Sequence, residues 1–175
     1  MRLFLLLGVG LSLLLCGCAS EEEIGDETPQ QRQAKTEVSN AIENSFEGVN
    51  EVELFSIDPS YDVRKDKSVS NSLPSLGGYK VIGYSALRDK DSINDLARSL
   101  GEGIRNTNGA IAMCFAPRHA LRFKKDGSEI TLIICFQCRN ASAEGIKNIV
   151  WFHTTNSPEP VFDAIFKRAG LPKAP

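Results

Sequence analysis

The densest group of reactive side chains in this 175-residue chain contains three cysteines, an arginine and a histidine. They stand in two segments, CFAPRH at 114–119 and CFQC at 135–138. Thiolates and imidazoles are zinc ligands, a thiol beside an imidazole can act as a nucleophile, and two cysteines separated by two residues can form a redox pair. The candidate functional residues are Cys114, Arg118, His119, Cys135 and Cys138.

The spacing of these residues argues against each of these chemistries. A zinc site needs a tight turn between paired cysteines, and an extended segment 128–139 would point Cys135 and Cys138 to opposite faces of a sheet. A thiol nucleophile would pair Cys114 or Cys135 with His119 or with the chain's second histidine, His153, yet no local nucleophile motif accompanies them. We therefore expect the cysteines to be small buried apolar residues. We expect no metal, no cofactor and no catalytic residue.

A β-hairpin is predicted at Asp126-Gly127, because a two-residue turn with positive φ at both positions favours such a pair. With Lys125 opposite Ser128, the apolar residues of both strands fall on one face and the polar residues on the other. Continued along both strands, this register keeps Cys114, Cys135 and Cys138 too far apart, or on opposite faces, for a bond. We expect no disulfide among them.

The elements around this hairpin predict a single α+β domain over 49–175. Apolar residues at helical spacing predict helices over 91–107 and 158–169, with Asp91 or Ser92 capping the first and Ser157 capping the second. The predicted strands are listed here in chain order: 52–57, 79–87, 110–117, 118–125, 128–139 and 148–154. The two helices should pack on the apolar face of a mainly antiparallel sheet of five to six strands.

A serine-, aspartate- and lysine-rich stretch, 58–78, separates the first two predicted strands. Asp58 and Pro59 should end the first strand, since proline cannot donate a hydrogen bond to a neighbouring strand. The composition indicates a loop, which we expect to be mobile.

Charge divides the chain unequally. Residues 19–53 carry ten acidic and two basic side chains, giving −8, whereas residues 54–175 carry 12 acidic and 17 basic, giving +5. The acidic part, 18–48, should be a tether with a helix over 29–45 that begins with Thr28 as N-cap and Pro29. The weak apolar stripe of this helix argues against tight docking. A basic stripe of Arg118, Arg122 and Lys124, with Arg139 nearby, could attract an anionic polymer or lipid head groups. We expect it instead to be a solvated face or to receive the acidic tether, with no nucleic acid as partner.

The first residues resemble the signal peptide of bacterial lipoproteins. Arg2 precedes the apolar stretch 3–15, which is shorter than the roughly 20 residues that cross a membrane as a helix. The sequence Leu15, Cys16, Gly17, Cys18 matches the lipoprotein pattern at Cys18 and not at Cys16. The resemblance implies that residues 1–17 are removed, that Cys18 is acylated and that the chain is anchored at the cell envelope. Because Ala19 and not aspartate follows, it implies the outer membrane in a Gram-negative cell, on its periplasmic face or at the surface.

The segments CFAPRH and ICFQC, with VELFSIDP before them and SPEPVFDAIFKRAGLP after them, resemble an uncharacterised family of small bacterial proteins. That resemblance implies no activity. The function we expect is a non-enzymatic envelope lipoprotein that binds an envelope protein or a small ligand. The alternative is a hydrolase or thiol enzyme that depends on cysteine and histidine.

Overall fold

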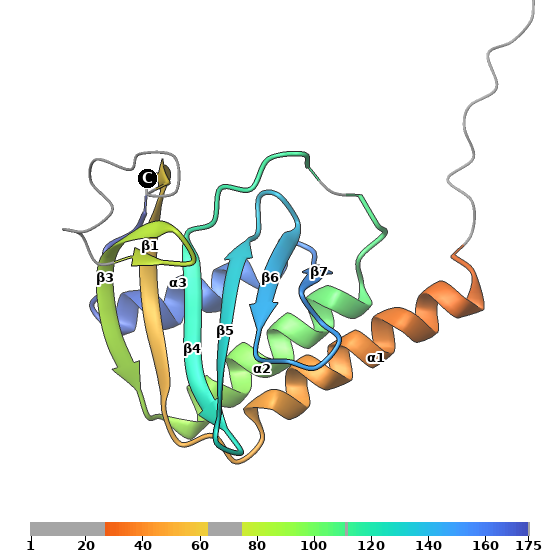
Figure 1. Cartoon of the computed structure of the whole chain (residues 1–175), viewed down its shortest axis with the longest axis horizontal. Coiled ribbons are helices and arrows are strands. Elements are labelled where there is room, and N and C mark those ends of the chain that lie inside the picture. The colour runs from red at the N-terminus through yellow and green to blue at the C-terminus, as the bar shows by residue number, and fades with distance from the viewer. Residues whose placement is uncertain (1–26, 63–74, 111, 175) are drawn as a thin grey trace, which may run out of the picture.

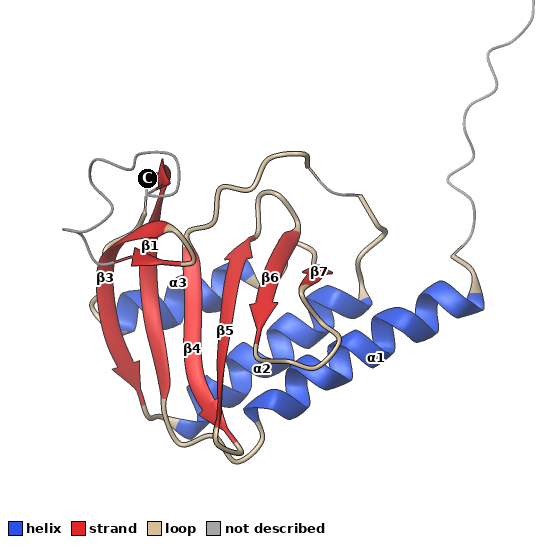
Figure 2. Cartoon of the chain, in the orientation of Figure 1, coloured by secondary structure: helices blue, strands red, loops and turns tan. Residues whose placement is uncertain are grey.

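Seven antiparallel strands form one sheet in the order β2-β3-β1-β4-β5-β6-β7. The computed structural model describes residues 27–62, 75–110 and 112–174. The strands are β1 (Val52–Asp62), β2 (Ser75–Leu76), β3 (Tyr79–Leu87), β4 (His119–Lys125), β5 (Ser128–Cys135), β6 (Asn140–Glu144) and β7 (Trp151–His153). The helices are α1 (Pro29–Phe46), α2 (Lys90–Arg105) and α3 (Glu159–Arg168). All three helices lie on the same face of the sheet (Figures 1 and 2).

The α+β class and the single domain are confirmed, whereas the predicted number of strands, five to six, is wrong. The described residues form a sheet of seven strands. Strand β2 has only two residues, and the β6 sequence NASAE contains no β-branched or aromatic residue, so neither gave a separate signal in the sequence. The predicted strand over 110–117 is absent from the described part of that range, which runs as an irregular connection. The described residues form three helices, where two packed helices and a further helix over 29–45 in the tether were expected.

The register of the β4–β5 hairpin is confirmed. Lys125 pairs with Ser128, and the pairing continues without a slip to His119 and Ile134. Asp126 and Gly127 both have positive φ, 49° and 80°, as a two-residue turn of type I′ requires.

Strand β1 is longer than the sequence predicted. It continues through Asp58 and Pro59 to Asp62, with a register irregularity against β3 between Asp58 and Asp62. Proline is tolerated at such an irregular position because the regular hydrogen bonds are already interrupted there. The predicted loop 58–78 is thus wrong at both of its ends, since β2 and the turn into β3 occupy 75–78. The middle of that loop, 63–74, lies outside the described residues.

Most of the core lies between the sheet and the helices. The helices and the sheet both contribute its largest fully buried side chains. These include Ile42 of α1, Leu54 of β1, Leu100 of α2, Leu132 of β5 and Phe162 of α3. A smaller cluster lies on the opposite face of the sheet, which we call the outer face. It comprises Phe55, Ile57, Tyr79, Ala120 and Ile133, with Phe115 packed against it.

Helix α1 packs tightly against α2, contrary to the expectation from its weak apolar stripe. Ile42 and Phe46 are buried in the main core. Arg105 of α2 forms an ion pair with Glu43 at 2.9 Å and also donates to the hydroxyl of Ser39. The helix is therefore part of the folded domain.

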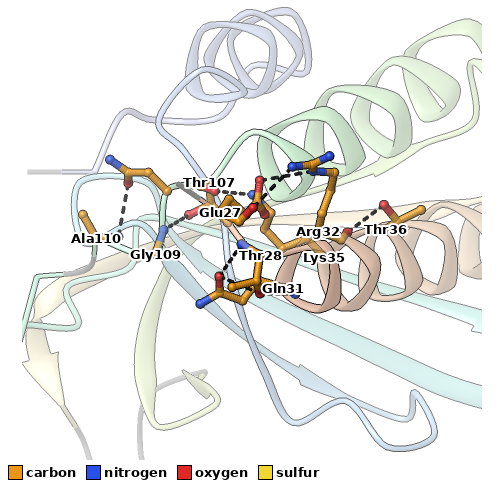
Figure 3. A network of polar contacts seen from close by, with 10 residues as sticks. Glu27, Thr28, Gln31, Arg32, Lys35, Thr36, Thr107, Gly109 and Ala110 are labelled. Atoms are coloured by element: carbon orange, nitrogen blue, oxygen red, sulfur yellow. Dashed lines mark hydrogen bonds and ion pairs between the residues drawn. The ribbon is translucent and has the colours of Figure 1, made fainter. Parts of the chain in front are cut away.

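Thr28 caps α1, as predicted from the sequence. Its hydroxyl accepts from the backbone N–H of Gln31 at 3.2 Å, and the Gln31 side chain accepts from the Thr28 N–H at 2.9 Å (Figure 3). Lys35 lies between Glu27 and the end of α2, with its Nζ 2.6 Å from both Glu27 Oε1 and the Thr107 carbonyl oxygen. These contacts fix the start of α1 to the residues that follow α2.

The N-caps of the other two helices lie one to three residues away from the predicted N-caps. Asp89, and not Asp91 or Ser92, caps α2 by accepting from the Ser92 N–H at 2.9 Å. The Ser92 side chain, and after it the Ser92 backbone N–H, lower the pKa of Asp89 by hydrogen bonding to its carboxylate. Helix α3 begins at Glu159 with Pro158 at its N-cap position.

Candidate functional site

Cys135 and Cys138 form a disulfide, which corrects the prediction that no such bond exists. Strand β5 ends at Cys135, and the chain turns through 136–139 so that Asn140 pairs with Cys135 in β6. Arg139, with φ of 56°, closes this turn. The prediction assumed that the strand continues to 139; the turn instead brings the two Cα atoms to 5.2 Å, within the range of a disulfide.

The third cysteine of the domain lies against this disulfide. Cys114 is exposed, and its Sγ lies 3.4 Å from Cys138 Sγ. Two backbone groups hold its loop in place: Ala112 N–H donates to the Cys138 carbonyl at 3.1 Å, and Ala116 N–H lies 3.4 Å from Cys138 Sγ. Cys114, Cys135 and Cys138 are called the cysteine cluster below.

Aromatic side chains surround the loop that carries Cys114. The ring of Phe115 lies 6.2 Å from that of Tyr79 and 5.0 Å from that of Trp151 between centroids. Figure 1 shows the connection between α2 and β4 passing over the ends of β5 and β6. The packing of Phe115 on the outer face therefore positions Cys114 beside the β5–β6 turn.

The cysteine cluster offers no metal site in the described parts of the chain. The sulfurs of Cys135 and Cys138 are joined to each other and are therefore not thiolate ligands. Among the described residues, no group of three or more His, Cys, Asp or Glu side chains is placed to hold a metal ion.

His119 lies on the other face of the sheet from the cysteines. It pairs with Ile134, whose side chain packs in the main core, and Cys135, the next residue of β5, points to the opposite face. His119 is buried against the rings of Phe136, Phe162 and Phe166. The sequence therefore predicted one cluster where the structure has two sites.

A hydrogen bond to Asp163, which also forms an ion pair with Lys173, anchors His119. Its Nε2 lies 2.9 Å from Asp163 Oδ1 of α3, and Asp163 Oδ2 accepts from Lys173 Nζ at 3.2 Å. Burial lowers the pKa of His119, and the positive charges of Arg118 and Lys173 act in the same direction, while Asp163 opposes them. The ring is therefore neutral at pH 7, and Nε2–H donates to Asp163.

A cleft of about 450 Å³ opens beside His119. We call it the His119 cleft. Its polar wall comprises Ser56, Arg118, His119, Glu159, Asp163, Lys167 and Lys173, and its apolar wall comprises Phe166, Leu171, Pro172 and Ala174. Ser56 lies opposite His119 in the β1–β4 pair, but its hydroxyl donates to the Pro172 carbonyl at 2.6 Å. This bond holds the C-terminal segment against the cleft.

Arg118 connects the two sites. Its Nη1 donates at 2.9 Å to Oε1 of Gln137, which stands between the bonded cysteines, and the same side chain lines the His119 cleft. The rest of the predicted basic stripe is partly neutralised: Arg122 bonds Glu53 at 2.5 Å and lies over the ring of Phe55. The Glu53 bond is the main cause that raises the pKa of Arg122.

Sequence reasoning missed the partners of His119. The sequence pattern places Asp163 and Lys167 on the solvent-facing side of an amphipathic helix. Lys173 follows that helix in a proline-flanked segment. Only the packing of α3 and the C-terminal segment against β1 and β4 brings these charges to the histidine. Cys18, the predicted lipidation site, lies outside the described residues.

The comparisons with known proteins returned no family model, no curated protein and no solved structure that matches this chain. The resemblances to bacterial lipoproteins and to the family with the CFAPRH and ICFQC segments therefore stay predictions.

Proposed function

We propose that this chain is an envelope lipoprotein, anchored through lipid on Cys18, whose domain binds a small organic anion in the His119 cleft without transforming it. The observation that carries the binding proposal is the cleft itself. It combines a fixed polar floor, made by His119 and Asp163, with a basic rim and an apolar wall. Its volume of about 450 Å³ suits a small molecule.

The charges around the cleft favour an anion. Arg118, Lys167 and Lys173 supply three positive charges against the two carboxylates Glu159 and Asp163. Asp163 is already engaged with His119 and Lys173. Within the described part of the chain Lys167 has no ion-pair partner and stays available for a ligand. Phe166 and Leu171 would contact the apolar part of the same molecule.

The alternative function, a hydrolase with a cysteine nucleophile and a histidine base, receives less support. His119 and Cys135 face opposite sides of the sheet. His153 pairs with Asn140, which pairs in turn with Cys135, so two strand spacings of about 5 Å each separate it from that cysteine. Ser56, which pairs with His119 between β1 and β4, donates its hydroxyl to the Pro172 carbonyl instead.

The anchor is supported by the signal-like sequence that ends at Cys18. Separately, no helix among the described residues is long and apolar enough to cross a membrane. The proposed location is the outer membrane, on its periplasmic face or at the surface, if the cell is Gram-negative.

Metabolic labelling with an alkyne analogue of palmitate tests the anchor. The full-length chain and its Cys16→Ser variant should both incorporate the label, and the Cys18→Ser variant should not. Cys16→Ser is the matched control, because it removes a thiol two residues away within the same sequence. Label that persists in Cys18→Ser would refute lipidation at this residue.

Calorimetric titration of the purified full-length protein tests the cleft. Benzoate and phenyl phosphate are the anionic probes, and benzyl alcohol is the uncharged control. Lys167→Glu should weaken anion binding about fivefold or more, since it reverses a charge at the rim. Lys147→Glu, on an exposed residue of the β6–β7 connection, should leave binding unchanged. Equal affinity for the anions and for benzyl alcohol would contradict an anion site.

A further inference from the structure

We propose that the cysteine cluster is a thiol–disulfide exchange site, in which Cys114 is the nucleophile, Cys138 is the sulfur it attacks and Cys135 is the leaving group. This inference is independent of the His119 cleft and of any ligand bound there. It rests on the 3.4 Å separation of Cys114 Sγ and Cys138 Sγ, with Cys138 already bonded to Cys135.

The three sulfurs differ in their access to solvent. Cys135 and Cys138 are 1% and 0% exposed, whereas Cys114 is exposed. A thiol in solution therefore cannot reach the disulfide directly while the domain is folded. Cys114 can reach it, because it is open to solvent on one side and contacts Cys138 on the other.

The internal step conserves atoms and electrons. Cys114 loses its proton to solvent, and its thiolate attacks Cys138 Sγ. A bond forms between Cys114 and Cys138, the bond between Cys138 and Cys135 breaks, and its electron pair leaves on Cys135 Sγ, which then takes up a proton. One disulfide replaces another, so no oxidant or reductant is needed.

The surroundings of Cys135 favour its departure. The backbone N–H of Cys138 lies 3.2 Å from Cys135 Sγ and can donate to the leaving thiolate. The carbonyl oxygen of Ala116 lies 3.4 Å from the same sulfur and can accept from the thiol once it is protonated. Both groups are in position before the exchange begins.

The rearranged bond is the form that an external dithiol can attack. A substrate thiolate would bond to the exposed Cys114 Sγ and release Cys138 as a thiolate, which takes up a proton. The second thiol of the substrate, having lost its proton, would then attack the substrate sulfur that is bonded to Cys114. A disulfide forms within the substrate, and Cys114 leaves as a thiolate that takes up a proton. The substrate leaves as a disulfide, and the protein, its disulfide reduced, keeps three thiols. The substrate class is therefore a compound or polypeptide with two neighbouring thiols.

Tryptic peptides distinguish the two disulfides. Cleavage after Arg105 and Arg118 releases Cys114 in peptide 106–118, and cleavage after Lys125 and Arg139 releases both other cysteines in peptide 126–139. The bond seen in the structure stays within one peptide, whereas a Cys114–Cys138 bond links the two. In the Cys135→Ser variant of the full-length protein, incubated with oxidised glutathione, we expect the linked pair to be the main product. Glutathione adducts without linked peptides would overturn the proposal.

Reduction by dithiothreitol under native conditions gives a second test that does not depend on the Cys135 variant. Samples are quenched in acid and alkylated, and the doubly alkylated peptide 126–139 is followed over time. Cys114→Ser should slow the appearance of this peptide by about tenfold or more, because dithiothreitol can no longer reach the disulfide through the exposed Cys114 sulfur. Met113→Ser, on a neighbouring residue that is 99% exposed, is the matched control and should reduce like the wild type. Equal rates for Cys114→Ser and wild type would overturn the proposal.

Discussion

Asp163 of α3 accepts a hydrogen bond from His119 of β4 at 2.9 Å, within a ring of three phenylalanines. This bond joins the C-terminal helix to the sheet and holds a neutral histidine in the core. Arg118 and Lys173 disfavour the protonated ring, whereas Asp163 favours it. Burial also disfavours the protonated ring, and its effect on the pKa of His119 is larger than that of Asp163.

The stability of the domain should therefore fall with pH on the acidic side of neutrality. Burial lowers the pKa of His119 below its unfolded value of 6.5. Below that pH the unfolded chain binds a proton that the folded chain does not, so the free energy of unfolding decreases until the folded pKa is reached. Urea denaturation between pH 7.5 and 5, chosen to span the usual histidine range of about 6.5, measures this slope.

Two glutamine variants separate His119 from the other titrating groups. His119→Gln keeps a donor for Asp163 without titrating, and should show a shallower dependence on pH than the wild type. His153→Gln replaces an exposed histidine and should keep the wild-type slope. Identical slopes in the wild type and His119→Gln would contradict the assignment.

Phe46→Ala should show that α1 belongs to the folded domain. Phe46 is 3% exposed, and its ring lies 4.5 Å from that of Phe123 between centroids. Truncation of such a side chain costs about 3–5 kcal/mol, measured as the loss of free energy of unfolding in urea. Gln33→Ala, on the exposed face of the same helix, should cost little. A small loss for Phe46→Ala would indicate that α1 docks weakly.

Gly103→Ala should destabilise the protein, although glycine to alanine in a helix usually stabilises it by about 1 kcal/mol. A Cβ at this position would lie 2.4 Å from Thr154 Oγ1 and 2.6 Å from Pro158 Cγ. The clash pushes α2 away from the β7–α3 connection and should cost about 1–3 kcal/mol. Thermal unfolding measures the change, with Glu102→Ala at the exposed neighbouring position as control. Stabilisation by Gly103→Ala would mean that Thr154 and Pro158 move aside without a loss of folding free energy.

Gly127→Ala should cost about 1 kcal/mol through the backbone alone. The residue has φ of 80°, and a Cβ there would meet no atom within 4 Å. Gly127→Asn should cost less, because asparagine tolerates positive φ better than alanine does. Urea denaturation of both variants checks this order, and equal losses would indicate that backbone conformation does not limit the turn.

The β4–β5 hairpin was predictable because its evidence is local. Asp126-Gly127 specifies the turn, and the alternation from Phe123 to Leu132 allows one register only. The CFQC turn was not predictable in the same way. Phe136 and Gln137 are not turn residues, and nothing in the sequence marks Arg139, whose positive φ closes the turn.

The docking of α1 and the composition of the His119 cleft depend on packing between distant segments. The buried face of α1 contains Ser39 and Ser45 beside Ile42 and Phe46, so its apolar stripe understates how much of the helix is covered. The hydroxyls of both serines donate to backbone carbonyls, of Gly101 and Ile42 respectively, which lets them be buried at little cost. The bond from Ser39 to Gly101 forms only once α1 and α2 pack together, whereas the bond from Ser45 to Ile42 lies within α1.

The two outermost strands of the described sheet, β2 and β7, are also its shortest, with two and three residues. A long, flat outer strand offers a row of free backbone groups to which another chain can add, and proteins limit that risk by keeping such strands short. Molecules held side by side on one membrane would meet far more often than molecules diluted in solution. For a protein anchored as proposed, the brevity of β2 and β7 would therefore protect neighbouring copies from aggregating edge to edge.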